Sequence, residues 1–451
     1  EYMQARAADI GDISQRVIKN LKGIADNAID TITEPCIIVA NDLTPSDTAK
    51  IGGKPVAGFI TKIGGRTSHS AIMARSMGIP AIVGAGEKAD EIADGDLLLI
   101  DGAAGEVVAQ PDEQTLADFA ERQKADAAHR AMLAQYKDKE GATSDGRRVI
   151  IEGNIGTPDD AVRVAELGGE GVGLFRSEFL FMDRTDLPSE EEQFAAYKKA
   201  CEIMPGKPVI IRTLDIGGDK EVPALALEQE QNPFLGYRAI RICLNQPELF
   251  LIQLRALLRA AQYGDLRIMF PMISSVDEVR DAKQVLEQAK DMLTAEGVPF
   301  NSNVKVGIMV EIPVAAVCAD VLAKEVDFFS IGTNDLIQYS CAVDRINEKI
   351  SYLYRPLHPG VLRLIAMTAK AANENGIEVG VCGEMAGTAG MAPVLCGLGV
   401  TNLSMSASAM LAAKADLAKH SCDECRELAD KLLACASASD AERIFTDWRE
   451  S

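Results

Sequence analysis

The sequence predicts an α/β protein whose C-terminal part is a closed (β/α)8 barrel. After residue 141, eight apolar runs of strand length alternate with stretches of helical pattern. Between residues 35 and 110, shorter apolar segments alternate with glycine turns, and from 112 to 140 the chain contains neither glycine nor proline. A small sheet-bearing domain and one long helix are therefore expected to precede the barrel.

The region before the barrel divides into three parts. Residues 1–34 are interpreted as the helical remnant of an N-terminal region, because the charged, periodic stretch 5–21 looks like the end of a helix. The chain does not open on methionine, so we expect a preceding piece to be missing. Residues 35–110 form the small domain, and residues 111–141 form a polar linker helix. Strands of the small domain are expected at 36–40, 56–63, 81–83, 97–100 and 106–108.

Residues 142–451 are assigned to the barrel, with strands at 149–153, 171–174, 209–213, 266–272, 304–312, 327–332, 378–382 and 402–405. An open doubly wound sheet is the alternative, and periodicity alone does not exclude it. Polar groups that follow the strands favour the closed (TIM) barrel, because barrel enzymes assemble their sites at the C-terminal strand ends. These groups are Arg176, Arg212, Asp215, Glu311, Asn334, Asp335, Cys382 and Glu384.

Composition excludes several classes of protein. The chain has 46 Lys and Arg against 67 Asp and Glu, and a net charge of −21 argues against broad binding to nucleic acid or anionic membrane. With 47% hydrophobic and 25% charged residues it is globular rather than disordered. No apolar run approaches the ~18 residues of a membrane span. The ten scattered cysteines are typical of cytosolic thiols, which predicts a cytoplasmic protein.

A histidine lies at the predicted start of a helix in segment 64–75. Thr67 and Ser68 occupy N-cap positions, which places His69 in the first turn. Free backbone amides and the helix dipole favour a phosphoryl group there, and Arg66 adds a positive charge. The imidazole of His69 is therefore a candidate covalent phosphate carrier.

This segment resembles the phosphohistidine motif of enzyme I of the phosphoenolpyruvate-dependent sugar phosphotransferase system. Pyruvate phosphate dikinase and phosphoenolpyruvate synthase are related, but they typically have Thr-Cys-His where this chain has Thr-Ser-His, which favours enzyme I. The resemblance covers essentially the whole chain and implies that the small domain swivels. Further matching stretches are 173–181, 212–220, 232–238, 309–313, 328–336, 343–345 and 382–387.

The resemblance implies a phosphoenolpyruvate site at the barrel mouth. This substrate carries a phosphate and a carboxylate within a few atoms, and guanidinium groups suit both. By resemblance, Arg176 and Arg212 bind the phosphate, Arg345 binds the carboxylate end with help from the Asn334 amide, and Arg238 lines the same pocket.

Two carboxylates and a cysteine complete the implied site. Glu311 and Asp335 are expected to end two different strands, and hard carboxylate oxygens favour Mg²⁺, which would neutralise the departing enolate. The enolate must then gain a proton at carbon. The resemblance assigns this proton to Cys382, with Glu384 as a tuning residue behind it.

The implied activity is transfer of the phosphoryl group of phosphoenolpyruvate to His69, with release of pyruvate, and then to the small histidine phosphocarrier protein HPr. The linker helix is the natural arm for the swing of the small domain. By the resemblance, the subdomain that docks HPr would precede residue 1, and we expect almost all of it to be missing from this sequence. The barrel is expected to form a homodimer.

The residues alone leave two other functions possible. A dikinase-type enzyme would use a nucleotide, although no glycine-rich nucleotide loop is visible. A non-enzymatic phosphoenolpyruvate sensor would need neither His69 nor Cys382. The pair Cys422 and Cys425 beside His420 is a weak zinc motif, and we expect these thiols one turn apart on a peripheral helix.

Overall fold

The computed structural model describes residues 29, 31–43, 47, 50, 51, 54–64, 74, 79–102, 104–182, 184–218, 222–225, 227, 228, 230–345, 347 and 349–450. The chain divides into two compact units, residues 1–129 and residues 130–451.

The first unit contains the small sheet. Strands β1 (Cys36–Ala40), β2 (Val56–Thr61) and β3 (Ala81–Ile82) form a parallel sheet in that order, while β4 (Leu98–Asp101) and β5 (Glu106–Ala109) form an antiparallel pair. Successive residues of the central strand β2 belong to two apolar clusters, one on each face of the sheet. All five predicted strands are found, with small differences at their ends.

Helix α4 (Glu113–Ala134) ends earlier than residue 141, where the polar pattern placed its end. Buried Lys414 explains the difference, because its Nζ donates to the carbonyl oxygens of Lys139 and Gly168, each at 2.7 Å. Gly168 has φ +71°, and a Cβ there would lie 1.7 Å from the Lys137 carbonyl oxygen. Tertiary contacts therefore hold the segment after α4 in turns rather than in a continued helix.

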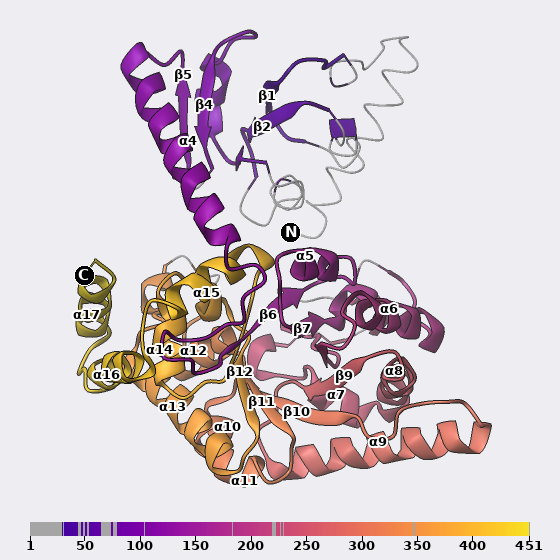
Figure 1. The fold of residues 1–451 in the computed structure, drawn as a ribbon. Coiled ribbons are helices and arrows are strands. Elements are labelled where there is room, and N and C mark those ends of the chain that lie inside the picture. Colours follow the sequence, from indigo (N-terminus) through magenta and orange to yellow (C-terminus); the bar gives the residue numbers. More distant parts are fainter. Residues whose placement is uncertain are drawn as a thin grey trace, which may run out of the picture. The chain divides into compact units, whose positions relative to one another are not determined.

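The second unit is the predicted barrel. Eight parallel strands pair in sequence order, and the last pairs with the first to close the barrel (Figure 1). The closed pairing confirms the barrel and excludes the open sheet. The strands are β6 (Ile150–Ile155), β7 (Val172–Arg176), β8 (Pro208–Arg212), β9 (Asp265–Phe270), β10 (Lys305–Val310), β11 (Phe328–Ile331), β12 (Glu378–Val381) and β13 (Asn402–Met405).

Helices surround these strands (Figure 1). Three of the helices begin with a capping box, in which a serine and a glutamate three residues later bond each other's backbone amides: Ser189 and Glu192, Ser275 and Glu278, and Ser421 and Glu424. The helices are α5 (Asp160–Glu166), α6 (Glu190–Ile203), α7 (Ile240–Asn245), α8 (Pro247–Ala260), α9 (Val276–Glu296), α10 (Pro313–Val317), α11 (Ala319–Leu322), α12 (Thr333–Cys341), α13 (Pro359–Glu374), α14 (Met391–Gly397), α15 (Met410–Leu417), α16 (Cys422–Leu433) and α17 (Ala438–Glu450).

The barrel has two separate apolar layers. A large cluster fills the space between strands and helices. A small cluster inside the barrel consists of Leu174, Ile210, Met269, Met309, Phe328 and Cys382. Because side chains alternate along a strand, one strand supplies both layers.

None of the described helices has the length and apolar character needed to cross a membrane.

Candidate active site

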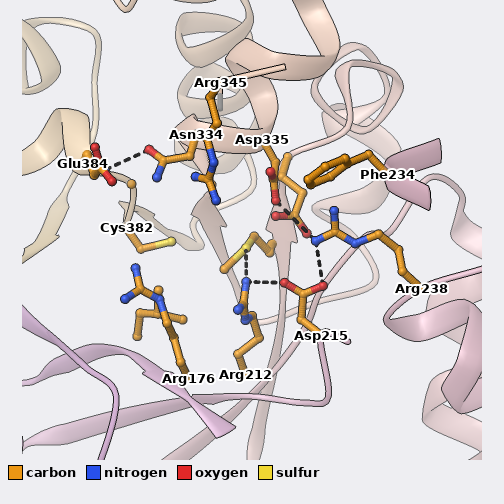
Figure 2. Close-up of a pocket in the computed structure, with 15 residues that line it drawn as sticks. Arg176, Arg212, Asp215, Phe234, Arg238, Asn334, Asp335, Arg345, Cys382 and Glu384 are labelled. Carbon is orange, nitrogen blue, oxygen red and sulfur yellow. Dashed lines mark hydrogen bonds and ion pairs between the residues drawn. The ribbon is translucent and has the colours of Figure 1, made fainter. Parts of the chain in front are cut away.

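A pocket of about 350 Å³ lies at the C-terminal ends of the barrel strands. Nine predicted site residues line it: Arg176, Arg212, Arg238, Glu311, Asn334, Asp335, Arg345, Cys382 and Glu384. Figure 2 shows side chains from separate strands and loops facing one space. The remaining two, His69 and Arg66, lie outside the described residues.

Strand ends position four of these groups. Arg176 and Arg212 are the last residues of β7 and β8 and are partners in the ladder between them. Glu311 directly follows β10, and Cys382 directly follows β12. Parallel strands end at the same rim of a barrel, so these four side chains converge although up to 206 residues separate them in the chain.

One local prediction was wrong. Asp335 was expected to end a strand, but β11 stops at Ile331, and Asp335 lies with Asn334 in the first turn of α12. Gly332 lies between β11 and α12, and it passes so close to Glu311 that a Cβ on this glycine would lie 3.0 Å from the Glu311 Oε2. The strand therefore turns into a helix beside Glu311, and this turn brings Asp335 over the pocket.

Two of the four arginines are buried among carboxylates. Arg212 pairs with Glu178 at 2.5 Å and with Asp215 at 2.8 Å. Arg238 pairs with Asp215 at 2.8 Å and with Asp335 at 3.5 Å. Burial lowers the pKa of both guanidiniums, but these carboxylates, Asp215 foremost, raise it by more, so both stay charged.

The same two arginines each have an unused donor. The Nε atoms of Arg212 and Arg238 are buried and have no hydrogen-bond partner among the described residues. A buried donor without a partner costs about 1–3 kcal/mol.

The other two arginines are exposed to the pocket. Among the described residues, no carboxylate forms an ion pair with Arg176 or with the side chain of Arg345. Figure 2 shows the Arg345 guanidinium beside Asn334 and the Arg176 guanidinium on the other side of Cys382. Two guanidiniums without a partner make this part of the pocket a site for an anionic ligand.

Glu311 combines burial with neighbouring negative charge. Its Oε1 accepts a hydrogen bond from the Met272 amide at 2.7 Å. Burial first, and then the charges of Asp335 and Asp215, raise the pKa of Glu311 to about 8. Within the described ranges, no group of three or more His, Cys, Asp or Glu side chains could hold a metal ion. A cation at Glu311 and Asp335 would therefore need further oxygens from a ligand.

Cys382 is a buried thiol at the edge of the pocket. Only 2% of its surface is exposed, and burial raises the pKa of the thiol to about 11, so it carries its proton at neutral pH. The Asn154 side chain holds the loop by donating to the Cys382 carbonyl oxygen at 2.9 Å. A protonated thiol facing a ligand pocket can act as an acid.

A hydrogen bond joins the Asn334 side chain to the Glu384 backbone. The Asn334 Oδ1 accepts from the Glu384 amide at 3.1 Å, which leaves the Asn334 NH₂ group as the donor toward a ligand. The Glu384 side chain lines the pocket and is exposed. Its backbone amide, and not its carboxylate, makes this contact.

Sequence reasoning did not predict several partners of the site. Glu178 lies inside a matching stretch, and Asp215 follows a strand, but their pairing with arginines had no sequence signal. Asn154 lies one residue beyond the predicted strand 149–153, and nothing in the pattern connects it to Cys382. Phe234, whose ring centroid lies 5.8 Å from the Arg238 guanidinium carbon, was equally unpredicted as a contact.

Comparisons with known proteins agree with this geometry. Residues 130–422 match the family model described as "PEP-utilising enzyme, PEP-binding domain", and residues 32–105 match "PEP-utilising enzyme, mobile domain". The first match alone covers more than half of the chain. It includes every described residue that lines the pocket.

Curated relatives extend the similarity over nearly the whole chain. A phosphoenolpyruvate-protein phosphotransferase of Priestia megaterium is 52% identical over 98% of this chain and 77% of its own length. The enzyme of that name from Bacillus subtilis (strain 168) is 51% identical over 98% of this chain and 77% of its own length. The one from Staphylococcus carnosus (strain TM300) is 48% identical over the full chain and 79% of its own length. The chain therefore belongs to the family of the phosphoenolpyruvate-protein phosphotransferases.

Proposed function

We propose that this enzyme transfers the phosphoryl group of phosphoenolpyruvate to the imidazole of His69 and releases pyruvate. One observation carries this proposal. The pocket combines two arginines without carboxylate partners, two buried arginines held in place by carboxylates, and a buried protonated thiol. That set suits a small dianionic substrate whose product must be protonated at carbon.

The four arginines take different roles. Arg212, held by Glu178 and Asp215, binds the phosphate from a rigid position, and Arg176 binds it from the neighbouring strand end. Arg345 and the Asn334 NH₂ group bind the carboxylate, while Arg238 lines the pocket beside Asp335. Fixed donors stabilise the charge that develops as the bond from phosphorus to the enol oxygen breaks.

Glu311 and Asp335 would hold Mg²⁺ together with oxygens of the substrate. The donor set fits, because both groups are hard carboxylates, and burial, followed by the charge of Asp335, raises the pKa of Glu311. When bound, the cation would neutralise negative charge on the enolate oxygen. Cys382 then donates its thiol proton to the enolate carbon, and the new methyl group completes pyruvate.

The phosphorylated His69 passes its phosphoryl group to a protein acceptor, and we propose HPr of the sugar phosphotransferase system. We place this reaction in the cytoplasm, because ten cysteines scattered through a long chain are typical of a reducing compartment.

Two further residues have supporting roles in this proposal. Glu384 supports the Cys382 loop, and Arg66 supplies positive charge beside His69.

A direct incubation tests the activity. The full chain is mixed with Mg²⁺ and phosphoenolpyruvate labelled with ³²P, and protein-bound label and free pyruvate are measured. We expect both in equal amounts, with the protein label lost in acid and stable in base, as a phosphorylated histidine requires. Pyruvate without protein label would contradict the transfer to histidine, and a requirement for nucleotide would favour a dikinase.

Homodimer formation through the barrel is a further proposal. A ligand that binds the dimer more tightly than the monomer stabilises the dimer by mass action. We therefore expect sedimentation velocity to show a dimer whose dissociation constant falls when phosphoenolpyruvate and Mg²⁺ are added. A monomer at high protein concentration with both ligands present would contradict this.

A further inference from the structure

A second, much smaller cavity lies inside the barrel. Its volume is about 10 Å³, close to what a single water molecule needs, and it is separate from the pocket at the mouth. Polar groups from four strands line it: Glu152 from β6, Ser330 from β11, Glu378 from β12 and Ser404 from β13. Gly173 and Gly380 also line it, so the space exists where two strands lack side chains.

Glu152 is a buried carboxyl group with an unused oxygen. It is 1% exposed, and its Oε1 has no hydrogen-bond partner in the part of the chain that the structure describes. Arg267, Glu378 and Glu170 are the charged groups around it, and Asn402 is a hydrogen-bonding neighbour. Burial raises the pKa of Glu152 to about 7, so a large fraction of this carboxyl carries a proton at neutral pH.

Ser330 connects this cavity to the thiol at the pocket. It lines the cavity, is 3% exposed, and lies on β11 opposite Gly380 in the ladder to β12. Cys382 directly follows β12, two residues after Gly380. The Cys382 thiol donates to the carbonyl oxygen of Ile331, the residue after Ser330, at 3.7 Å. Burial raises the pKa of this thiol, and the neighbouring Ser330 side chain lowers it in part.

We propose that Glu152, a water molecule in this cavity and Ser330 form the route by which Cys382 regains its proton after each turnover. The inference rests on the proposed function, in which Cys382 gives its proton to the enolate carbon. The thiolate then takes the proton of the Ser330 hydroxyl, the hydroxyl takes one from the water, and the water takes one from the Glu152 carboxyl. Glu152 is left as a carboxylate.

Bulk water restores the Glu152 proton at the opposite end of the cavity. The Glu378 side chain lines the same cavity and is 37% exposed, so it reaches solvent at the N-terminal end of the barrel. One solvent proton is consumed for each enolate protonated. A proton route through the barrel interior can reach the thiol while pyruvate is still bound. The Cys382 side chain is 2% exposed, and bound pyruvate would cover that part on the pocket side.

Two isotope exchanges in one reaction distinguish this role from a structural one. The full chain is incubated in deuterated water with Mg²⁺, phosphoenolpyruvate and ¹⁴C-labelled pyruvate. Exchange of carbon label between the two compounds needs the thiol proton to move back and forth, but not to leave the protein. Deuterium enters the pyruvate methyl group only when Cys382 exchanges its proton with solvent.

Glu152→Gln is the first variant, because it keeps the shape of the side chain and removes its acidic proton. We expect the ratio of deuterium entry to carbon exchange to fall about tenfold or more, while carbon exchange itself stays within about twofold. A side chain that merely supported the fold would lower both rates together.

Gly380→Ala is the second variant, and it leaves Glu152, Ser330 and Cys382 in place. A Cβ at this position would approach no atom closer than Asn402 Cβ at 3.4 Å, so the methyl group fits and occupies part of the cavity. Loss of the water should lower the same ratio. Glu166→Gln is the matched control, because Glu166 pairs with Arg163 on the exposed side of α5 and does not line the cavity.

The outcomes are separable. Absence of carbon exchange in the unmodified chain contradicts the proposed function and not the relay alone. An unchanged ratio in both Glu152→Gln and Gly380→Ala, with carbon exchange intact, overturns the relay. Parallel loss of both rates in these variants, or an equal fall in the ratio for Glu166→Gln, also overturns it. Thermal unfolding of each variant shows whether the fold is retained.

Discussion

Replacing His69 with alanine is expected to abolish phosphorylation of the chain by phosphoenolpyruvate. The imidazole is the proposed acceptor, and alanine has no atom that can form a bond to phosphorus. The nine predicted site residues that line the pocket belong to the unit 130–451, so binding of phosphoenolpyruvate and Mg²⁺ should be nearly unchanged. Protein-bound ³²P and calorimetric titration measure the two properties separately.

His129→Ala is the control for this experiment. His129 is exposed on α4, and its loss should leave labelling at the level of the unmodified protein. Acid-labile label that persists in His69→Ala would show that another residue is the acceptor. Loss of label in both variants would point instead to a general disturbance of the first unit.

The second large effect is expected for Cys382→Ala. Protonation of the enolate follows departure of the phosphoryl group, so this variant should still bind phosphoenolpyruvate and transfer its phosphoryl group. Release of pyruvate should slow by about 10²- to 10⁴-fold, the usual contribution of a positioned acid. Chiral analysis of pyruvate formed in deuterated water from stereospecifically tritiated substrate should show one face of the methyl carbon protonated by the native enzyme and a mixture for the variant.

Arg212→Ala provides the contrast, because it should lose phosphoryl transfer itself. It removes a buried cation from between Glu178 and Asp215, and removing one partner of a buried ion pair costs about 3–5 kcal/mol of stability. Its melting temperature should therefore fall, whereas that of Cys382→Ala should change little. Native rates and native face selection in Cys382→Ala would remove the thiol from the mechanism and leave its loop a structural role.

Much of the architecture was predictable from local pattern. The apolar runs of the barrel strands and the serine-glutamate pairs at three helix starts are short-range signals, because strand alternation and helix capping involve neighbouring residues. Each of the eight barrel strands overlaps its predicted range. Since the strands are parallel, their ends also predicted that Arg176, Arg212, Glu311 and Cys382 would gather at one rim.

Partners that meet across the barrel had no such signal. Glu178 and Arg212 are 34 residues apart in the chain, and Asn154 and Cys382 are 228 apart. Lys414, which holds the segment after α4 in turns, is 275 residues away in the chain from its partner Lys139. These contacts depend on strand register and on loop paths, which periodicity does not encode.

The sequence by itself determined the fold class, the order of the elements, the family resemblance and the residue types at the barrel mouth. Only the tertiary structure decided which arginines are neutralised by carboxylates and which remain open to a ligand. It also decided that Asp335 begins a helix, and that Glu152 and Ser330 share a cavity behind Cys382. The physical reason is that charge pairing and burial depend on distances in space, and closure of the barrel sets those distances between residues far apart in the chain.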